Sequence, residues 1–353
     1  MKSDKPIASL SLDLDNKWSY MKTHGDSKWE SLPSYLALLV PRVLGFLKAQ
    51  NLTITFFIVG QDAALERNRE LLASIAAAGH EIGNHSFHHE PWLHRYSEQQ
   101  IEMEISRAED HIEHATGYRP IGFRGPGFEL SRVTLEVLAR RGYLYDASTL
   151  PTFLGPLARA YYFMTAKLTR EQRTERNALF GGFAEVLRPI RPYRWQMDAG
   201  ALIEIPVTTM PVFKVPIHVS YILYLSMFAP ALALRYFQFA LRLCQLTGTQ
   251  PSLLLHPLDF LDCEDTQDLS FFPGMKLPSE KKLELVSEVL ALFSAQFTIR
   301  TVQQHAREVS QVSNLRVIGP CFRSDNRTSG HLLSKLIVFR SKFDHPTPRG
   351  TAK

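Results

Sequence analysis

Two histidines four positions apart, His85 and His89, are the side chains of this chain best suited to chemistry. On a helical turn, residues at i and i+4 point to the same side. Two neutral imidazoles that converge in this way can hold a divalent metal once a third, usually acidic, ligand arrives from elsewhere. Candidates for that ligand are Asp13 and Asp15, at the end of the apolar run 7–14. The histidine pair alone is a weak signal, because most such pairs are ordinary surface or core residues.

Short apolar runs alternate with longer helical patterns along the chain. The expected strands cover residues 7–14, 52–59, 81–84, 121–124, 143–146, 202–207, 252–256 and 297–301. The expected helices cover residues 65–78, 97–115, 131–141 and 279–295, with serine caps or glycine stops at their ends. This alternation predicts parallel strands joined by crossover helices, and seven or eight such units favour a barrel over an open sheet. No glycine-rich phosphate loop follows any expected strand, which disfavours a dinucleotide-binding fold.

Titratable side chains end or follow five of these eight strands. In a parallel barrel the carboxyl ends of the strands meet at one face, where active sites form. Asp13 and Asp15 end the first strand, His85 and His89 follow the third, Arg124 ends the fourth, Asp146 the fifth and His256 the seventh. Each of these residues alone has an ordinary structural explanation, such as an ion pair. Their coincidence at five strand ends favours one catalytic site.

Two regions interrupt the alternation, and a tail follows it. Residues 151–197 form a long insertion after the fifth strand, with eight Lys or Arg against three Asp or Glu. Residues 216–244 are strongly apolar and form either a buried helix pair or an interfacial surface that contacts lipid, since Pro230 argues against a bilayer-spanning helix. Residues 311–353 carry eight Lys or Arg against two Asp or Glu without clear periodicity, which predicts a flexible tail. The basic regions are either solvated surfaces or attract an anionic surface or a phosphate-bearing substrate.

The composition is that of a globular protein, with 353 residues, 45% of them hydrophobic and 21% charged. This length allows one large or two ordinary domains. Cys244, Cys263 and Cys321 show no paired or metal-binding spacing, and the N-terminus shows no secretory signal. We therefore expect a cytoplasmic location. The basic runs lack a nucleic-acid motif, so we expect no nucleic-acid partner.

Residues 7–150 and 200–300 resemble the polysaccharide deacetylases of carbohydrate esterase family 4, whose catalytic region is the NodB homology domain. The most specific part is TFFIVG at 55–60 followed by AGHEIGNHSFHH at 78–89, which is similar to the family's second motif, His-[Ser/Thr]-x-x-His. Asp13 and Asp15 resemble an Asp-x-Asp variant of the first motif. Arg124 with its following Gly-Pro resembles the third, and the Leu-Leu-His run ending at His256 resembles the fifth. No tryptophan follows Asp146, a departure from the fourth motif.

The resemblance implies a distorted (β/α)7–8 barrel of the NodB type over residues 1–310, with a helical insertion after the fifth strand and a tail from 311. It implies one divalent metal, zinc (Zn²⁺) by preference, held by Asp15, His85 and His89. Asp13 would be the general base, Arg124 would orient it and keep it ionised, and His256 would donate a proton to the leaving amine. Asp146 would hold His256 in its charged form, with Asp259 or Asp198 as alternatives for that task.

By the same resemblance, the chain hydrolyses an N-acyl group, normally N-acetyl, of an amino sugar in a glycan or a lipid-linked glycan precursor. The basic insertion and the apolar segment 216–244 favour a lipid-linked, phosphate-bearing glycan and peripheral contact with an anionic membrane at its inner face. Two alternatives stay open. One is a metal-dependent amidohydrolase on a small non-sugar amide, and the other is an inactive relative that only binds a glycan.

Overall fold

The computed structural model describes residues 5–154 and 186–319, which belong to one compact unit, Met1–Gly319. The strands of this part are β1 Ile7–Leu14, β2 Thr55–Ile58, β3 Glu81–Asn84, β4 Gly122–Phe123, β5 Tyr145–Asp146, β6 Tyr193–Met197, β7 Gly200–Glu204, β8 Ser252–Leu255, β9 Thr298–Arg300 and β10 Val317–Ile318. The helices are α1 Lys17–His24, α2 Leu36–Ala49, α3 Gly60–Ala63, α4 Arg69–Ala77, α5 Glu98–Thr116, α6 Arg132–Arg140, α10 Val219–Ser226, α11 Pro230–Thr247, α12 Ser279–Gln296 and α13 Val302–Ser310.

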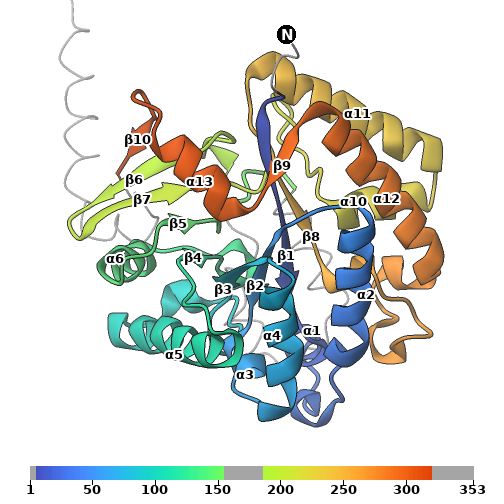
Figure 1. Ribbon diagram of the computed structural model, residues 1–353, viewed down its shortest axis with the longest axis horizontal. Coiled ribbons are helices and arrows are strands. Elements are labelled where there is room, and N and C mark those ends of the chain that lie inside the picture. Colours follow the sequence, from blue (N-terminus) through green and yellow to red (C-terminus); the bar gives the residue numbers. More distant parts are fainter. Residues whose placement is uncertain (1–4, 155–185, 320–353) are drawn as a thin grey trace, which may run out of the picture. The chain divides into compact units, whose positions relative to one another are not determined.

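The described strands form one sheet in the order β10-β6-β7-β5-β4-β3-β2-β1-β8, and β9 pairs with β1 (Figure 1). All neighbours are parallel except β6 and β7. The two ends of this order approach each other, because the Thr208 N–H donates to the Ser252 carbonyl (3.0 Å) and the Ser252 N–H donates to Thr208 Oγ1 (2.8 Å). The sheet therefore curls toward closure between the segment after β7 and the start of β8, as a distorted barrel requires.

β1 is the central strand of this arrangement. Ser9 has register partners in both β8 and β9, and Ser11 has partners in both β8 and β2. β9 and β2 thus share one edge of β1, and β8 occupies the other. Seven of the eight residues of β1 are buried, as expected for a parallel strand covered on both faces.

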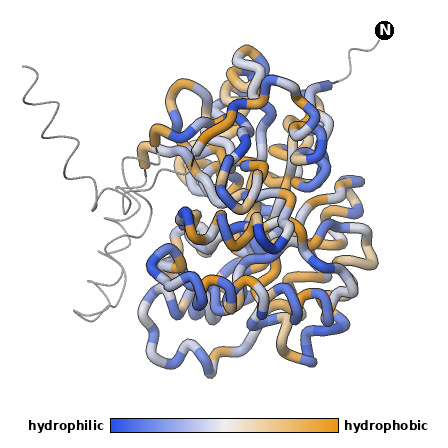
Figure 2. Tube along the Cα trace, turned by 90° about the vertical axis from the view of Figure 1, so that its left-hand side faces the viewer, coloured by the Kyte–Doolittle hydropathy of each residue, from blue (hydrophilic) through white to orange (hydrophobic). Residues whose placement is uncertain are grey.

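The two faces of β1 differ in chemistry because successive side chains alternate. Leu10, Leu12 and Leu14 belong to the main apolar core. The alternate face is a polar column: Ser9 Oγ lies 3.0 Å from His305 Nδ1, Ser11 Oγ accepts from Arg124 Nη1 (2.9 Å), and Asp13 follows. This column leads to the carboxyl end of the strand, where the candidate site residues gather. Figure 2 shows hydrophobic and hydrophilic stretches alternating along the chain.

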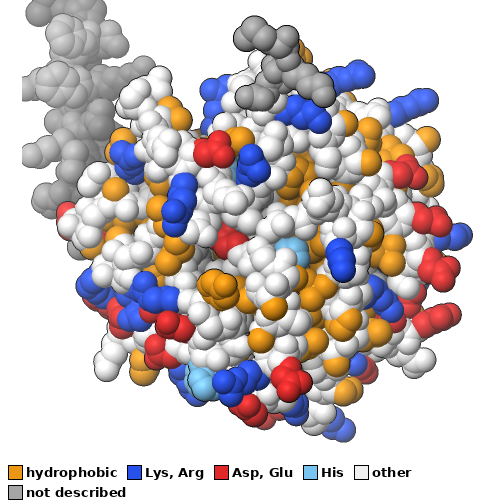
Figure 3. All heavy atoms as spheres, viewed as in Figure 1, with side chains coloured by type: hydrophobic (Ala, Val, Ile, Leu, Met, Phe, Trp, Pro, Cys, Tyr) orange, Lys and Arg blue, Asp and Glu red, His pale blue; other side chains and the backbone are white. Residues whose placement is uncertain are grey.

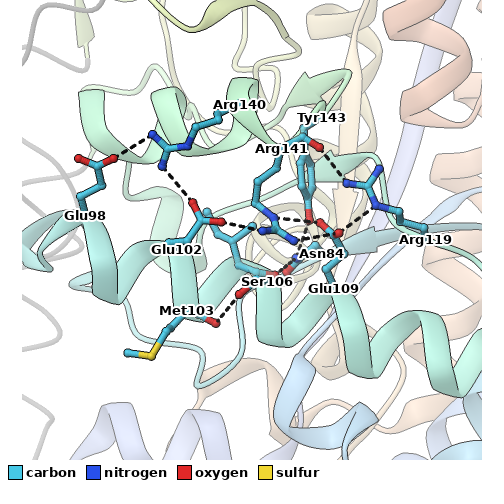
Figure 4. A network of polar contacts seen from close by, with 11 residues as sticks. Asn84, Glu98, Glu102, Met103, Ser106, Glu109, Arg119, Arg140, Arg141 and Tyr143 are labelled. Atoms are coloured by element: carbon cyan, nitrogen blue, oxygen red, sulfur yellow. Dashed lines mark hydrogen bonds and ion pairs between the residues drawn. The ribbon is translucent and has the colours of Figure 1, made fainter.

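A network of ion pairs and hydrogen bonds ties α5 and α6 to the end of β3 (Figure 4). Arg141 donates to Glu102 (2.6 Å) and Glu109 (3.0 Å) on α5. At the inner end of the network, Asn84 Nδ2 donates to the Tyr143 hydroxyl (2.8 Å) and to a carbonyl of α5 (3.0 Å). Asn84 precedes His85, so the network fixes the strand end from which the histidine loop departs.

Most expected elements lie within a few residues of the observed ones. The additions to the expected set are the strands β6 and β10 and the helices α1, α2, α3 and α13. Residues 216–244 form the predicted helix pair, α10 and α11, which contributes to the main core, and no helix in the described ranges is long and apolar enough to cross a bilayer. Of the basic insertion 151–197, residues 155–185 lie outside the described residues, as do residues 320–353 of the expected tail.

Candidate active site

Asp15, His85 and His89 converge on one point at the carboxyl ends of β1 and β3. Asp15 Oδ1 lies 2.9 Å from His89 Nε2 and 3.4 Å from His85 Nε2. One potential ligand atom from each residue lies within 4.8 Å of the other two; Asp15 and His85 are buried, and the side chain of His89 is 11% exposed. The predicted set of metal-binding residues is thus assembled in space.

The histidines reach this point from a loop and not from the helical turn that their spacing suggested. Ser86 and His89 have positive φ angles of 60° and 51°, which residues other than glycine rarely adopt. The loop is held by three backbone donors: the Ser86 N–H donates to Asn84 Oδ1 (2.9 Å), and the N–H groups of Phe87 and His88 donate to Glu104 Oε2 (3.1 and 2.9 Å). The carboxylate of Glu104 also binds His88 Nδ1, which turns His88 away from the metal point.

Gly60 permits this loop to lie close to α5. Its N–H donates to the Ser86 carbonyl (2.9 Å), and a Cβ at this position would lie 2.7 Å from the Phe87 ring and from the Ala108 backbone. A side chain larger than hydrogen would therefore push the histidine loop away from α5.

The donor chemistry of the three residues fits a divalent metal. His85 Nδ1 lies 2.6 Å from the Arg124 carbonyl oxygen, which can only accept, so Nδ1 carries the proton and Nε2 presents its lone pair toward Asp15. With the ring neutral, this lone pair and the carboxylate oxygen repel each other unless a metal cation lies between them, whereas a ring that is protonated on Nε2 as well donates to Asp15. Burial works to raise the pKa of Asp15, but His89 and His85 together lower it below its usual range. Asp15 is therefore ionised at neutral pH, as a metal ligand must be.

Several residues that the sequence did not single out support Asp15. The Tyr35 hydroxyl donates to the Asp15 carbonyl (2.6 Å). Asn16 caps α1 and its Nδ2 donates to Asp62 Oδ1 (2.7 Å), while the Trp18 indole N–H donates to the same carboxylate (3.1 Å). Burial raises the pKa of Asp62 to about 6. An asparagine between a strand and a helix is a capping signal. The position of Asn16 could therefore have indicated from the sequence that α1 begins shortly after Asp15.

Asp13 and Arg124 form a buried ion pair beside the metal point. Arg124 Nη1 lies 2.6 Å from Asp13 Oδ1, and the Arg124 side chain is 0% and the Asp13 side chain 5% exposed. Arg124 also donates from Nε to the Ala147 carbonyl (3.0 Å), and its guanidinium lies 4.2 Å above the Phe57 ring. These contacts fix the guanidinium on three sides, so the predicted neighbourhood of Asp13 and Arg124 is present in the structure.

His256 enters from the end of β8, next to the start of α10. Its Nδ1 lies 3.1 Å from Ser220 Oγ, and its ring centroid lies 6.0 Å from that of His218. Burial and the charge of His256 lower the pKa of His218 to about 3, so His218 is neutral. Asp259 accepts the His256 backbone N–H (2.8 Å), and its pKa, raised by burial, is pulled back by His256. Asp259 is therefore the carboxylate that faces His256.

The structure corrects the expected pairing of Asp146 with His256. Asp146 accepts from Ser148 Oγ (2.6 Å) and shares a side-chain hydrogen bond with Glu204, its register partner on β7. Burial raises the pKa of both carboxyls, that of Glu204 well above its usual value, so Glu204 holds the shared proton. Asp198, the other alternative, is an exposed partner of Arg132. Neither aspartate meets His256 in the hydrogen bonds of the described residues.

Tyr20 on α1 is a further residue that the sequence did not single out. Its hydroxyl is buried and has no hydrogen-bond partner among the described residues. Burial raises the pKa of Tyr20 well above its usual value, and the charges of Asp15 and Asp259 raise it further. The hydroxyl thus lies among the site carboxylates with its donor unused, as a group reserved for a bound molecule would.

Comparison with known proteins agrees with this geometry. Residues 29–145 match the sequence model of the polysaccharide deacetylases. A peptidoglycan deacetylase of Helicobacter pylori is 32% identical over 111 residues, which cover 31% of this chain and 37% of the relative. A peptidoglycan-N-acetylglucosamine deacetylase of Bacillus cereus is 31% identical over 104 residues, which cover 30% and 37%. The chain spans little more than a third of the length of either relative.

Solved structures extend the likeness beyond the matched segment. A Mycobacterium smegmatis crystal structure assigned to the polysaccharide deacetylases aligns over 91% of this chain and 95% of that one, with a TM-score of 0.59 and 21% identity. The structure of Puue allantoinase aligns over 89% and 93%, with a TM-score of 0.54 and 17% identity. These likenesses confirm the predicted distorted barrel of the NodB type. Residues 29–145 are thus similar in sequence to the polysaccharide deacetylases, and the solved structures show the fold of the larger chain.

Proposed function

We propose that this chain hydrolyses the N-acetyl group of an amino sugar, in a glycan or a lipid-linked glycan precursor, with one bound zinc ion. The observation that carries the proposal is the meeting of a metal-binding triad, an arginine-paired aspartate and a histidine at the carboxyl ends of β1, β3, β4 and β8. Acyl hydrolysis needs these three parts: an electrophilic centre, a base and an acid. We place the reaction in the cytoplasm, at the inner membrane face.

Asp15, His85 and His89 would hold the zinc ion. Bound there, zinc would act as a Lewis acid toward the acyl oxygen and would lower the pKa of water. Three protein ligands leave coordination positions for water and substrate, which is the pattern of catalytic zinc sites. The proton on His85 Nδ1, directed to the Arg124 carbonyl, keeps the ring orientation that this task requires.

Asp13 would take the proton from the attacking water. Its carboxylate is buried, and its Oδ1 accepts from Arg124 Nη1 at 2.6 Å, so Oδ2 would be the oxygen that takes the proton. Arg124 is a positioning residue, because its donors are directed to Asp13, Ser11 and a backbone carbonyl.

His256 would donate a proton to the amine as the carbon–nitrogen bond breaks. Ser220 holds Nδ1 at 3.1 Å, which leaves Nε2 as the nitrogen for the leaving group. Asp259, which accepts the His256 backbone N–H at 2.8 Å, is the carboxylate that would face the ring in this step. The two proton transfers are thus assigned to residues on different strands, Asp13 on β1 and His256 after β8.

A rival function uses the same residues on a different substrate. Metal-dependent hydrolysis of a small non-sugar amide would need the same base, acid and metal, and an allantoinase shares the fold. An inactive glycan-binding relative would have no use for the paired Asp13 or the oriented His85. A substrate panel separates these functions.

The test measures acetate release from N-acetylglucosamine oligomers and the ring-opening of allantoin to allantoate, using the purified, zinc-loaded protein. We expect release from the oligomers and none from Asp13→Asn, which should retain its zinc by elemental analysis. Asp110→Asn, the same change on the exposed surface of α5, is the matched control and should retain the activity. Acetate release by Asp13→Asn at a rate near that of the unaltered protein would exclude Asp13 as the base. Hydrolysis of allantoin alone would exclude the amino-sugar substrate.

A further inference from the structure

A long stretch of this chain carries no acidic residue. From position 205 to position 258 there is no Asp or Glu, while Lys214, Arg235 and Arg242 supply three positive charges. The stretch includes α10, α11 and the turn at 210–215 that precedes them. A surface without acidic residues and with scattered cations attracts anions, because nothing on it screens the positive charges.

The same stretch exposes large hydrophobic side chains. The most exposed are Val212 (74%), Phe213 (53%), Phe228 (74%), Leu232 (65%), Phe239 (49%) and Leu246 (82%). We call these six residues, with Arg235 and Arg242, the α10–α11 face. Phe213 and Phe239 lie together, with ring centroids 6.5 Å apart, so the turn and the helix form one surface. In Figure 3, hydrophobic side chains also reach the surface on the side where Figure 1 draws α10 and α11.

α11 has two apolar stripes where a surface helix needs one. Ala233, Phe237, Ala240, Leu241 and Cys244 are buried in the main core. Leu232, Phe239 and Leu246 follow a second stripe at helical spacing, interrupted by Arg235 and Arg242, and this stripe is exposed. An outward stripe in which arginines alternate with large apolar groups is the pattern of helices that lie in the interface of an anionic membrane.

A hydrophobic cavity of about 330 Å³ opens between the two helices. Its walls include Tyr221, Leu225, Phe228, Leu232 and Tyr236, and its lining has no charged residue. Phe228 and Leu232 belong to both the cavity and the exposed surface, so the cavity opens onto the α10–α11 face.

This cavity is also joined to the active site by ring contacts. The ring centroid of Tyr221 lies 6.1 Å from that of His218, which lies 6.0 Å from that of His256. Two contacts therefore lead from the proton donor to the apolar cavity, and α10 has one end at the site and the other at the exposed surface.

We propose that the α10–α11 face docks on an anionic lipid bilayer, with Phe228 and Leu232 inserted among the acyl chains and Arg235 and Arg242 beside the lipid phosphates. This proposal rests on the proposed function, because docking explains how the active site would reach its substrate. With α10 between the membrane and the site, the site would receive a glycan that is attached to a lipid. Association would be interfacial, because no described helix spans a bilayer.

The test is co-flotation of the full chain with vesicles, either of phosphatidylcholine alone or of equal parts phosphatidylcholine and phosphatidylglycerol. The protein should float with the anionic vesicles at low salt, and less so at high salt. Phe228→Asp with Leu232→Asp should lower the association constant roughly a hundredfold, since two large side chains lose their burial. Each of Arg235→Glu and Arg242→Glu should lower it roughly fivefold or more.

Met103→Asp is the matched control, since Met103 is 57% exposed on α5, away from the face. It should float like the unaltered protein. The proposal is overturned if the unaltered protein fails to float at low salt, or if the Phe228 and Leu232 replacements float equally well. It is also overturned if size-exclusion chromatography shows a dimer that these replacements dissolve, because the occupant is then a second copy.

Flotation does not require turnover, so the two proposals fail separately. Deacetylation of a soluble oligomer is measured on the same preparations. An active protein that does not float overturns the docking alone. A protein that floats through this face without deacetylase activity overturns the proposed function alone.

Discussion

Replacing Arg124 by methionine removes the cation that faces Asp13 inside the barrel and leaves the carboxylate buried without a partner. The two side chains are 0% and 5% exposed and approach to 2.6 Å, so water cannot take over the role of the guanidinium. At about 4 Å between charge centres and an effective dielectric constant near 20, their attraction is about 4 kcal/mol. Removal of one partner of a buried pair costs about 3–5 kcal/mol. We therefore expect Arg124→Met to lower the free energy of unfolding by about 4 kcal/mol.

A double-mutant cycle isolates the pair from the other contacts of Arg124. Asp13→Asn leaves the guanidinium without its anion, whereas the double variant Asp13→Asn/Arg124→Met leaves no charge behind. The loss of unfolding free energy in the double variant should therefore be smaller than the sum of the losses in the two single variants, by about 2 kcal/mol or more. The measurement is urea denaturation of metal-free protein at neutral pH, followed by tryptophan fluorescence.

The exposed pair of Arg132 and Asp198, with side chains 47% and 90% exposed, provides the control cycle. Its coupling should not exceed about 1 kcal/mol, because solvent screens the charges. The reasoning would be refuted if the stability losses of the Asp13 and Arg124 single variants added up to that of the double variant within about 0.5 kcal/mol. The two charges would then not depend on each other.

Three further predictions concern single residues. His85→Ala should lose zinc, and an unchanged zinc content by elemental analysis would exclude His85 as a ligand. Tyr20→Phe should retain fold and zinc but lower kcat/KM roughly tenfold, the effect of one lost hydrogen bond to substrate; an unchanged value would show that the hydroxyl does not contact substrate. Burial raises the pKa of Glu204 well above 4.5, so the folded state binds this proton more tightly and loses stability as pH rises above 4.5. Glu204→Gln should therefore gain stability relative to the unaltered protein between pH 5 and pH 8 in urea denaturation, and a constant difference would contradict the shared proton.

The strands were the most predictable part of the fold. β1 and β3 have the expected bounds, because long buried runs and a glycine stop before β3 leave little choice. β6 was not expected, since its alternating YRWQM pattern lies inside a basic insertion and its antiparallel partner β7 departs from the parallel rule. The partial closure through Thr208 and Ser252 depends on a side chain of a loop, which no periodicity reports.

The site was predictable where strand ends alone determine position. Asp13 and Asp15 both lie at the end of β1. Arg124 follows β4 and reaches Asp13 although β2 and β3 lie between the two strands, because the carboxyl ends of the strands converge in a barrel. The loop that carries His85 has a left-handed backbone that depends on Glu104, a residue of α5, so spacing alone suggested a helical turn instead. The partner of His256 was not predictable, because Asp146 forms its hydrogen bond with Glu204 instead. That contact results from the pairing of β5 with β7, which the sequence does not reveal.

The branching of β1 has a consequence for how the molecule forms on the ribosome. All three metal-binding residues have been synthesised by position 89, but the strands along both edges of β1 include β8 and β9, which end at 255 and 300. Until these emerge, a nascent chain exposes an unpaired edge of an apolar strand, which invites association with other chains. A fragment that ends at residue 145, where the sequence match ends, would contain every candidate metal ligand and still lack β8 and β9, the neighbours of the strand that leads to Asp15. The candidate metal site is therefore expected to form only after residue 300 has emerged.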